Sequence, residues 1–101
     1  MGTASYILKG TEKGMQETFG STIHGAGRTM SRRAAIKSWR GEEIVKKLRE
    51  QGILIKSRSL KGIAEEAPKA YKLVEEVVDV MHNAGITTKV AKLRPIISVK
   101  G

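Results

Sequence analysis

Glycines divide this chain into short segments, and this limits the folds that it can adopt. Apolar or amphipathic segments stop at a glycine in five places: Gly10, Gly20, Gly41, Gly52 and Gly85. Glycine adopts positive φ at no steric cost, so it commonly ends a helix or turns the chain. No apolar segment approaches the ~20 residues that a membrane-spanning helix needs, and no signal-peptide pattern is present. We therefore expect one unit of short elements over residues 1–101, and residence in the cytoplasm.

The apolar patterns predict strands that alternate with helices. Short β-favouring runs predict strands at 3–9, 53–55, 88–93 and 96–99. Three- and four-residue spacing predicts helices at about 12–19, 32–40, 42–51, 60–67 and 69–84. Thr11, Ser31 and Ser59 precede three of these helices and are suited to cap them. The alternation favours an α/β fold, with a mixed α+β fold as the alternative, and strand pairing stays open.

The expected core draws on few aromatic side chains. Tyr6, Phe19 and Trp39 are expected to be buried, and Tyr71 is left open between core and surface. Proteins that bind single strands usually stack bases on several exposed rings, so an aromatic platform is not expected. In the last predicted helix, valines at 77, 78 and 80 indicate burial on more than one side.

The balance of charge is strongly basic. Nineteen Lys and Arg against ten Asp and Glu give a net charge of +9, which favours a nucleic acid as partner, with an anionic membrane as the weaker alternative. The chain has no cysteine, which excludes disulfides and thiolate metal sites within it. Only His24 and His82 supply imidazoles, so no metal site within the chain is predicted. His82 is expected to have a packing or capping role.

Residues 20–33 hold the strongest candidate site. They contain three glycines, three arginines and His24, and Gly25 and Gly27 leave room beside the imidazole. The next predicted helix carries Arg32 and Arg33 in its first turn, where each cation costs about 0.3–1 kcal/mol unless an anion binds there. The pattern indicates a phosphate-binding loop with a histidine at its edge. The alternative is an ordinary loop with solvated arginines.

Five segments carry a resemblance to a known family: Gly-Thr-Ala-Ser-Tyr at 2–6, Thr-Phe-Gly-Ser-Thr at 18–22, His-Gly-Ala-Gly-Arg at 24–28 followed by Ser-Arg at 31–32, Ala-Glu-Glu-Ala-Pro at 64–68, and Leu-Arg-Pro at 93–95 with Val-Lys-Gly at 99–101. Together they resemble the C-terminal portion of the RtcB family of GTP-dependent RNA-splicing ligases, over essentially all 101 residues. The resemblance implies the C-terminal part of the RtcB-type fold. In the family, the larger N-terminal portion supplies the Asp, Cys and His ligands of manganese, and the chain does not resemble that portion.

Met1 corresponds to an internal position of the family. We therefore expect the chain to be a fragment: the product of a split gene, a piece downstream of an interrupting element, or a shortened version. Alone, it is expected to be inactive. The partners that the resemblance implies are the N-terminal portion of the ligase, archease, and RNA with a 3′-phosphate or 2′,3′-cyclic phosphate end and a 5′-hydroxyl end.

The resemblance also implies a definite reaction, which joins these RNA ends in tRNA splicing and RNA repair. GMP from GTP is first transferred to a histidine, which corresponds to His24, then to the RNA 3′-phosphate, and is finally displaced by the 5′-hydroxyl. A free imidazole is largely neutral near pH 7 and is therefore a suitable nucleophile. The alternative function is a small basic RNA-binding module without catalysis.

Roles for further residues follow from the same resemblance. The residues implied to contact the nucleotide are Met1, Ser5, His24, Gly25, Ala26, Gly27, Tyr71 and Lys100. Of these, Tyr71 would pack on the guanine face, and Lys100 would donate to the acceptor edge of the base. Arg28 and Arg32 would hold phosphates of the RNA end. The alternatives are that Tyr71 is a core ring and Lys100 an ordinary terminal charge.

Overall fold

The computed structural model describes all 101 residues, and the chain forms two compact units. Unit 1 comprises Met1–Thr3, Arg28–Tyr71 and Arg94–Gly101. Unit 2 comprises Ala4–Gly27 and Lys72–Leu93. The chain therefore passes from one unit to the other four times, and each unit combines segments that are distant in sequence. None of the helices is both long and apolar enough to cross a membrane.

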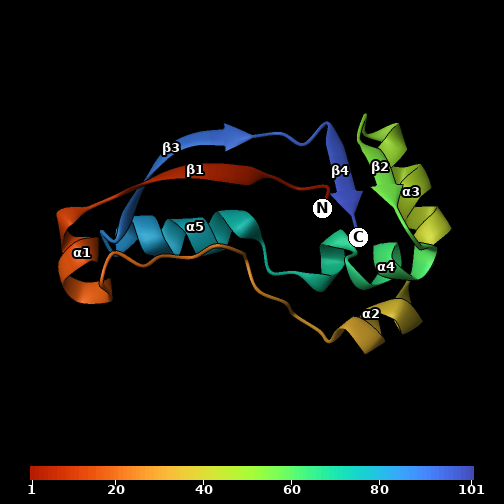
Figure 1. Ribbon diagram of the computed structural model, residues 1–101, viewed down its shortest axis with the longest axis horizontal. Helices are drawn as coiled ribbons and strands as arrows, with labels where there is room; N and C mark the ends of the chain where they lie inside the picture. The colour runs from red at the N-terminus through yellow and green to blue at the C-terminus, as the bar shows by residue number, and fades with distance from the viewer. The chain divides into compact units, whose positions relative to one another are not determined.

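Unit 1 combines three short helices and a 3₁₀-helix with a two-stranded sheet (Figure 1). Its elements are α2 (Arg32–Ser38), α3 (Gly41–Glu50), β2 (Leu54–Ser57), α4 (Leu60–Glu65), η1 (Pro68–Ala70) and β4 (Ile97–Lys100). Helices α3 and α4 contact strand β2. Strands β2 and β4 pair in parallel, with Leu54 opposite Ile97 and Ser57 opposite Lys100. The core consists of Ile44, Leu48, Ile53, Ile63 and Ala67. It forms because Ile44 and Leu48 lie one turn apart on α3 and present a single apolar stripe.

Unit 2 is an antiparallel pair of strands with two helices (Figure 1). Its elements are β1 (Ser5–Gly10), α1 (Glu12–Thr18), α5 (Val74–Asn83) and β3 (Thr87–Leu93). Strands β1 and β3 pair with a register shift between Ile7 and Leu8, and α5 packs against β3. The Thr11 hydroxyl accepts from the Gly14 amide at 2.9 Å and donates to the Gly85 carbonyl at 2.6 Å. This hydroxyl therefore caps α1 and ties its start to the turn after α5.

Several sequence predictions are confirmed. Helices and strands are combined in a mixed α+β arrangement, which the sequence offered as the alternative to an α/β fold. Thr11, Ser31 and Ser59 cap α1, α2 and α4, each accepting from the backbone amide three residues on. The side chain of His82, for which a packing or capping role was expected, is exposed and does not cap α5; its Nδ1 accepts from the Lys89 amide of β3 at 3.2 Å. The two-stranded sheets, one antiparallel and one parallel, settle the pairing that the sequence left open.

The single long helix predicted over 69–84 is wrong. Residues Pro68–Ala70 form a 3₁₀-helix, Tyr71 and Leu73 are extended, and α5 begins only at Val74. The backbone of Tyr71 forms a β-bridge with Arg28, and the Thr29 amide donates to the Ala70 carbonyl at 2.9 Å. Backbone groups that would form hydrogen bonds within a continuous helix are therefore used for pairing with residues 28 and 29. Tertiary pairing therefore overrides the apolar spacing.

Three predictions of burial are also wrong. Phe19 is 92% exposed, because α1 ends at Thr18 and Phe19 itself takes the left-handed position, with φ of 55°, at the C-cap. Leu54 lies in the apolar run Ile53–Ile55, whose composition predicts a buried strand, but it is 44% exposed, since β2 alternates between its two faces. Val80 is 65% exposed, so α5 buries its apolar residues on one side only. Tyr6 is half-buried, and Trp39 is half-buried against the core of unit 1.

A prediction concerns the close approach of α1 to the turn after α5. A Cβ at Gly14 would lie 2.5 Å from the Ile86 carbonyl oxygen, which belongs to the backbone and cannot move easily. We expect Gly14→Ala to lower the free energy of unfolding by about 1–3 kcal/mol, although alanine favours helices. Urea unfolding followed by helical circular dichroism measures this. Gly10→Ala is the matched control, because a Cβ there meets no atom within 4 Å; equal stability of both variants would contradict the prediction.

Candidate functional site

His24 lies in an open loop of unit 2. His24 and Gly25 form a bend, both residues are exposed, and the imidazole makes no hydrogen bond within the protein. A side chain at Gly25 would meet no atom within 4 Å, and Gly27 has a φ of +76° that other residues rarely adopt. Small residues thus leave the histidine accessible to a bulky ligand from several directions.

Hydrogen bonds hold both ends of this loop. At its start, the Thr18 hydroxyl donates to the Ser21 carbonyl at 2.6 Å. At its end, the Lys72 amide donates to the Gly27 carbonyl at 3.0 Å. The exposed histidine therefore belongs to a loop of defined course within unit 2, rather than to a free end.

Unit 1 contains a cluster of three side chains around a carboxylate, which we term the Glu66 cluster: Arg28, Arg32 and Tyr71 around Glu66. Arg28 Nη1 donates to Glu66 Oε1 at 3.4 Å and to the Tyr71 hydroxyl at 3.0 Å. The Tyr71 hydroxyl in turn donates to Glu66 Oε2. Arg32 Nε lies 3.8 Å from Glu66 Oε1. One carboxylate thus joins three of the side chains for which the sequence predicted contacts with ligand.

The two arginines of the cluster differ in how firmly they are held. Arg28 also donates through Nε to the Met30 carbonyl at 2.9 Å and through Nη2 to the Glu65 carbonyl at 2.6 Å. Its guanidinium carbon lies 4.7 Å from the centre of the Tyr71 ring, a cation–π distance. The Arg28 side chain is only 21% exposed, whereas that of Arg32 is 68% exposed. Arg28 is therefore a fixed part of the unit, whereas Arg32 is mostly exposed and is held only by its ion pair with Glu66.

Electrostatics link the cluster to both ends of the chain. Burial alone would raise the pKa of the Glu66 carboxyl, but it is held below its ordinary value by the hydrogen bond from Tyr71 and by the cations Lys100, Arg28 and Arg32. Burial and the contact with Glu66 raise the pKa of Tyr71. Burial and the charge of Lys100 lower the pKa of the Met1 amino group, and Glu66 opposes them. Lys100 and Met1 thus lie within electrostatic range of the cluster.

Sequence reasoning assigned no role to Glu66. One feature of the sequence did point to an anion here. Arg32 lies in the first turn of a helix, where a cation is unfavourable unless a negative charge is close by. The sequence pattern predicted a phosphate as this anion, whereas in the structure it is a carboxylate of the chain itself. Glu66 also lies in the Ala-Glu-Glu-Ala-Pro segment at 64–68 that carries part of the family resemblance.

The predicted site residues divide between the two units. Unit 2 contains Ser5, His24, Gly25, Ala26 and Gly27, and unit 1 contains Met1, Arg28, Arg32, Tyr71 and Lys100. The structure brings Arg28, Arg32 and Tyr71 together through Glu66, with Lys100 at the end of β4 and Met1 half-buried against the core. Three or more His, Cys, Asp or Glu side chains do not gather anywhere in the chain in a way that could hold a metal ion.

Comparison with known proteins adds an independent line of evidence. The family model described as "tRNA-splicing ligase RtcB" matches residues 1–101. Among curated proteins, "tRNA-splicing ligase RtcB" of Methanopyrus kandleri is 59% identical over the whole chain, and that of Methanocaldococcus jannaschii is 56% identical. The protein of the same name from Methanococcus maripaludis is 54% identical over the same span. The chain belongs to the tRNA-splicing ligase RtcB family.

The match covers only part of each relative. The 101 residues correspond to 10% of the Methanopyrus and Methanocaldococcus proteins and to 21% of the Methanococcus protein. The chain therefore spans between a tenth and a fifth of the length of the curated relatives that it matches, and these relatives differ about twofold in length.

The second prediction concerns the pH dependence of stability. Because the pKa of Glu66 is lowered in the folded state, its stabilising effect is fully present above the ordinary glutamate pKa of about 4.3 and is lost as the pH falls through the lower, folded value. We expect Glu66→Gln to lower the free energy of unfolding of the chain by about 1–3 kcal/mol at pH 7, since the half-buried Arg28 then loses its counter-charge. The difference from the wild type should shrink below about pH 4.

Glu65→Gln is the control for this experiment. It removes the neighbouring carboxylate but keeps the backbone carbonyl that accepts from Arg28. Urea unfolding between pH 3 and 7 gives both comparisons. Parallel stability curves for the wild type and Glu66→Gln across this range would contradict the assignment.

Proposed function

We propose that this chain is the guanylate-accepting part of a GTP-dependent RNA ligase and that His24 is its nucleophile. The observation that carries the proposal is the family match over residues 1–101, which includes the His-Gly-Ala-Gly-Arg segment at 24–28. The open surroundings of the imidazole support it, since a nucleophile must be accessible and free of competing hydrogen bonds.

The proposed reaction has three displacements at phosphorus. A ring nitrogen of His24 attacks the α-phosphorus of GTP, so that a P–N bond forms and pyrophosphate leaves. An oxygen of the RNA 3′-phosphate then attacks the same phosphorus, the P–N bond breaks, and the RNA carries GMP through a phosphoanhydride. Finally, the 5′-hydroxyl oxygen of the second RNA end attacks the RNA 3′-phosphorus, loses its proton and releases GMP. The covalent intermediate divides one difficult displacement into easier steps.

Other residues of the chain are proposed to bind and orient the ligands. Gly25, Ala26 and Gly27 would offer backbone groups to GMP, with Ser5 and Met1 beside it, Tyr71 on the guanine face and Lys100 at its acceptor edge. Arg28 and Arg32 would hold RNA phosphates. The structure suggests a division between these arginines: the fixed Arg28 orients Tyr71, and the exposed Arg32 provides the more accessible charge.

Departure of pyrophosphate normally calls for a divalent metal to stabilise the developing charge. Manganese is the metal that the family resemblance implies, but the carboxylates and histidines of this chain do not gather into a ligand set. We therefore propose that the metal ligands, and with them activity, come from the N-terminal portion of the ligase. Archease is the further protein partner that we propose.

The third prediction tests His24 by intact mass. After incubation of the chain with GTP, manganese and the N-terminal portion of a related ligase, we expect the mass of one GMP to be added and peptide mapping to place it on His24. The chain without that portion should stay unmodified. His24→Ala should lose the adduct completely, because no other group takes over a nucleophile of this kind.

His82→Ala is the control variant, since it removes the only other imidazole and should retain the adduct. Absence of an adduct from a mixture shown to be folded and associated would contradict the catalytic role. In that case, the net charge of +9 would favour the non-catalytic RNA-binding module.

A further inference from the structure

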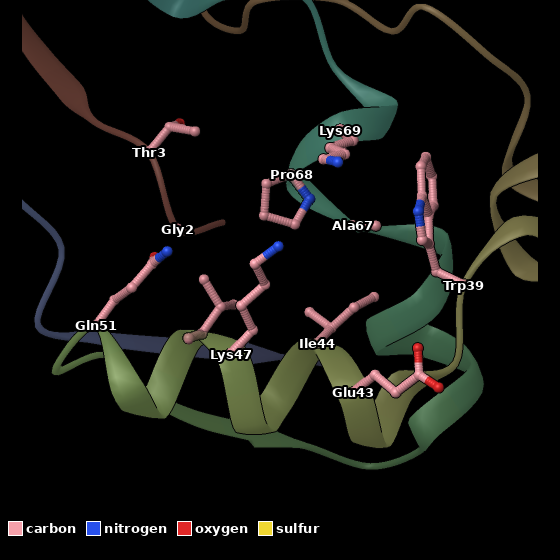
Figure 2. A pocket seen from close by; sticks show the side chains of 11 residues that line it. Gly2, Thr3, Trp39, Glu43, Ile44, Lys47, Gln51, Ala67, Pro68 and Lys69 are labelled. Carbon is pink, nitrogen blue, oxygen red and sulfur yellow. The ribbon is translucent and has the colours of Figure 1, made fainter.

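Unit 1 contains a pocket of about 410 Å³ between α3, η1 and the first residues of the chain (Figure 2). Its floor is apolar and consists of Ile44, Leu48, Ala67 and Pro68. None of the residues that line it is among those proposed to contact GMP or the RNA end. The pocket is therefore a second concave site on the chain that the proposed chemistry does not use.

We propose that this pocket binds one unpaired nucleotide of an RNA strand, with the base against Trp39 and the flanking phosphates at Lys47 and Lys69. This inference depends on the proposed function in one respect, that RNA is the partner. It adds a contact between the chain and a part of the RNA away from the two ends that are joined.

The size and floor of the pocket suit a flat heterocycle. Pockets for small ligands usually enclose about 300–1,000 Å³ and combine apolar walls with a few polar groups. Trp39 lines the pocket and is partly buried, because it also packs against the core of unit 1. Its amide donates to the Ala35 carbonyl at 3.1 Å, which fixes the residue at the end of α2. A tryptophan held in this way provides a stacking surface for one base.

The charge at the rim suits the phosphates on either side of that base. Lys47 and Lys69 line the pocket and are exposed, and Figure 2 shows Lys47 directed from α3 toward Pro68. Neither ammonium group forms an ion pair within the chain, whereas Lys89 and Lys92 are paired with carboxylates. The two lysines of the pocket are therefore available to a polyanion.

Glu43 is the one carboxylate in the lining, and Figure 2 shows it on the same side of the pocket as Trp39. Lys47 follows it by one helical turn, but the two side chains do not form an ion pair. A free carboxylate accepts hydrogen bonds from the amino groups of cytosine, adenine or guanine. Uracil has a single N–H between two carbonyl oxygens, which repel a carboxylate. We therefore expect the pocket to prefer bases that carry an amino group.

The fourth prediction uses the fluorescence of Trp39, which is the only tryptophan in the chain. Single-stranded oligomers of about eight nucleotides match the length that small single-strand binding sites cover. We expect oligocytidylate to quench this fluorescence and to bind about fivefold more tightly than oligouridylate. An abasic oligomer of the same length should bind only weakly and leave the fluorescence unchanged, because stacking contributes a large share of such affinity.

Two double variants distinguish binding in the pocket from binding by the overall positive charge of the chain. The double variant Lys47→Ala/Lys69→Ala should weaken oligocytidylate binding about tenfold and reduce the slope of log K against log salt by about 1.4, the value for two single-strand phosphate contacts. The control Lys37→Ala/Lys46→Ala loses the same charge from α2 and α3 but leaves the pocket lining intact. It should weaken binding less than about threefold. Glu43→Gln should reduce the preference for cytosine over uracil.

Three outcomes would overturn the proposal. One is equal loss of affinity in both double variants, which would mean binding by general charge. Another is unchanged Trp39 fluorescence with every oligomer while circular dichroism shows a folded chain. The third is loss of quenching when the N-terminal portion of the ligase is added, which would make the pocket a protein interface. Guanylylation of His24, measured by mass in the same preparations, tests the proposed function separately, so that failure of one does not imply failure of the other.

Discussion

The charge balance between Glu66 and its cations is the interaction on which the organisation of unit 1 depends. A half-buried guanidinium is stable only when its charge and its N–H groups are matched. Arg28 meets this condition through Glu66, Tyr71 and two backbone carbonyls. Because the same carboxylate also pairs with Arg32, the orientation of several side chains is set before any ligand arrives.

The helix caps could be predicted from the sequence because a cap depends on residues three positions apart, as for Ser31 and Ser59. The helix predicted over 69–84 failed because the backbone of Tyr71 pairs with Arg28, a contact 43 residues away that local spacing cannot show. The histidine loop could be proposed as a site from the sequence because its glycines and arginines lie together along the chain. Glu66 was missed for the opposite reason: its partners in the cluster, apart from Tyr71, lie more than 30 residues away.

The net charge of +9 consists of cations with different functions. Arg28, Lys89 and Lys92 are paired within the chain and serve mainly its own structure. Lys47 and Lys69 are unpaired and lie at a concave surface beside Trp39. A basic composition predicts affinity for polyanions in general. The position at which an RNA strand would bind depends on which cations are left unpaired within the chain.

The interleaving of the two units along the chain also has a consequence for recombination between related genes. Unit 1 is assembled from three separate stretches of the chain and unit 2 from two. A recombination event that exchanges one continuous piece of a gene would therefore not transfer either unit on its own. A crossover near Gly27 or Tyr71, for example, would combine parts of a unit from two parents. The two units are thus expected to be inherited, and to diverge, as a single block.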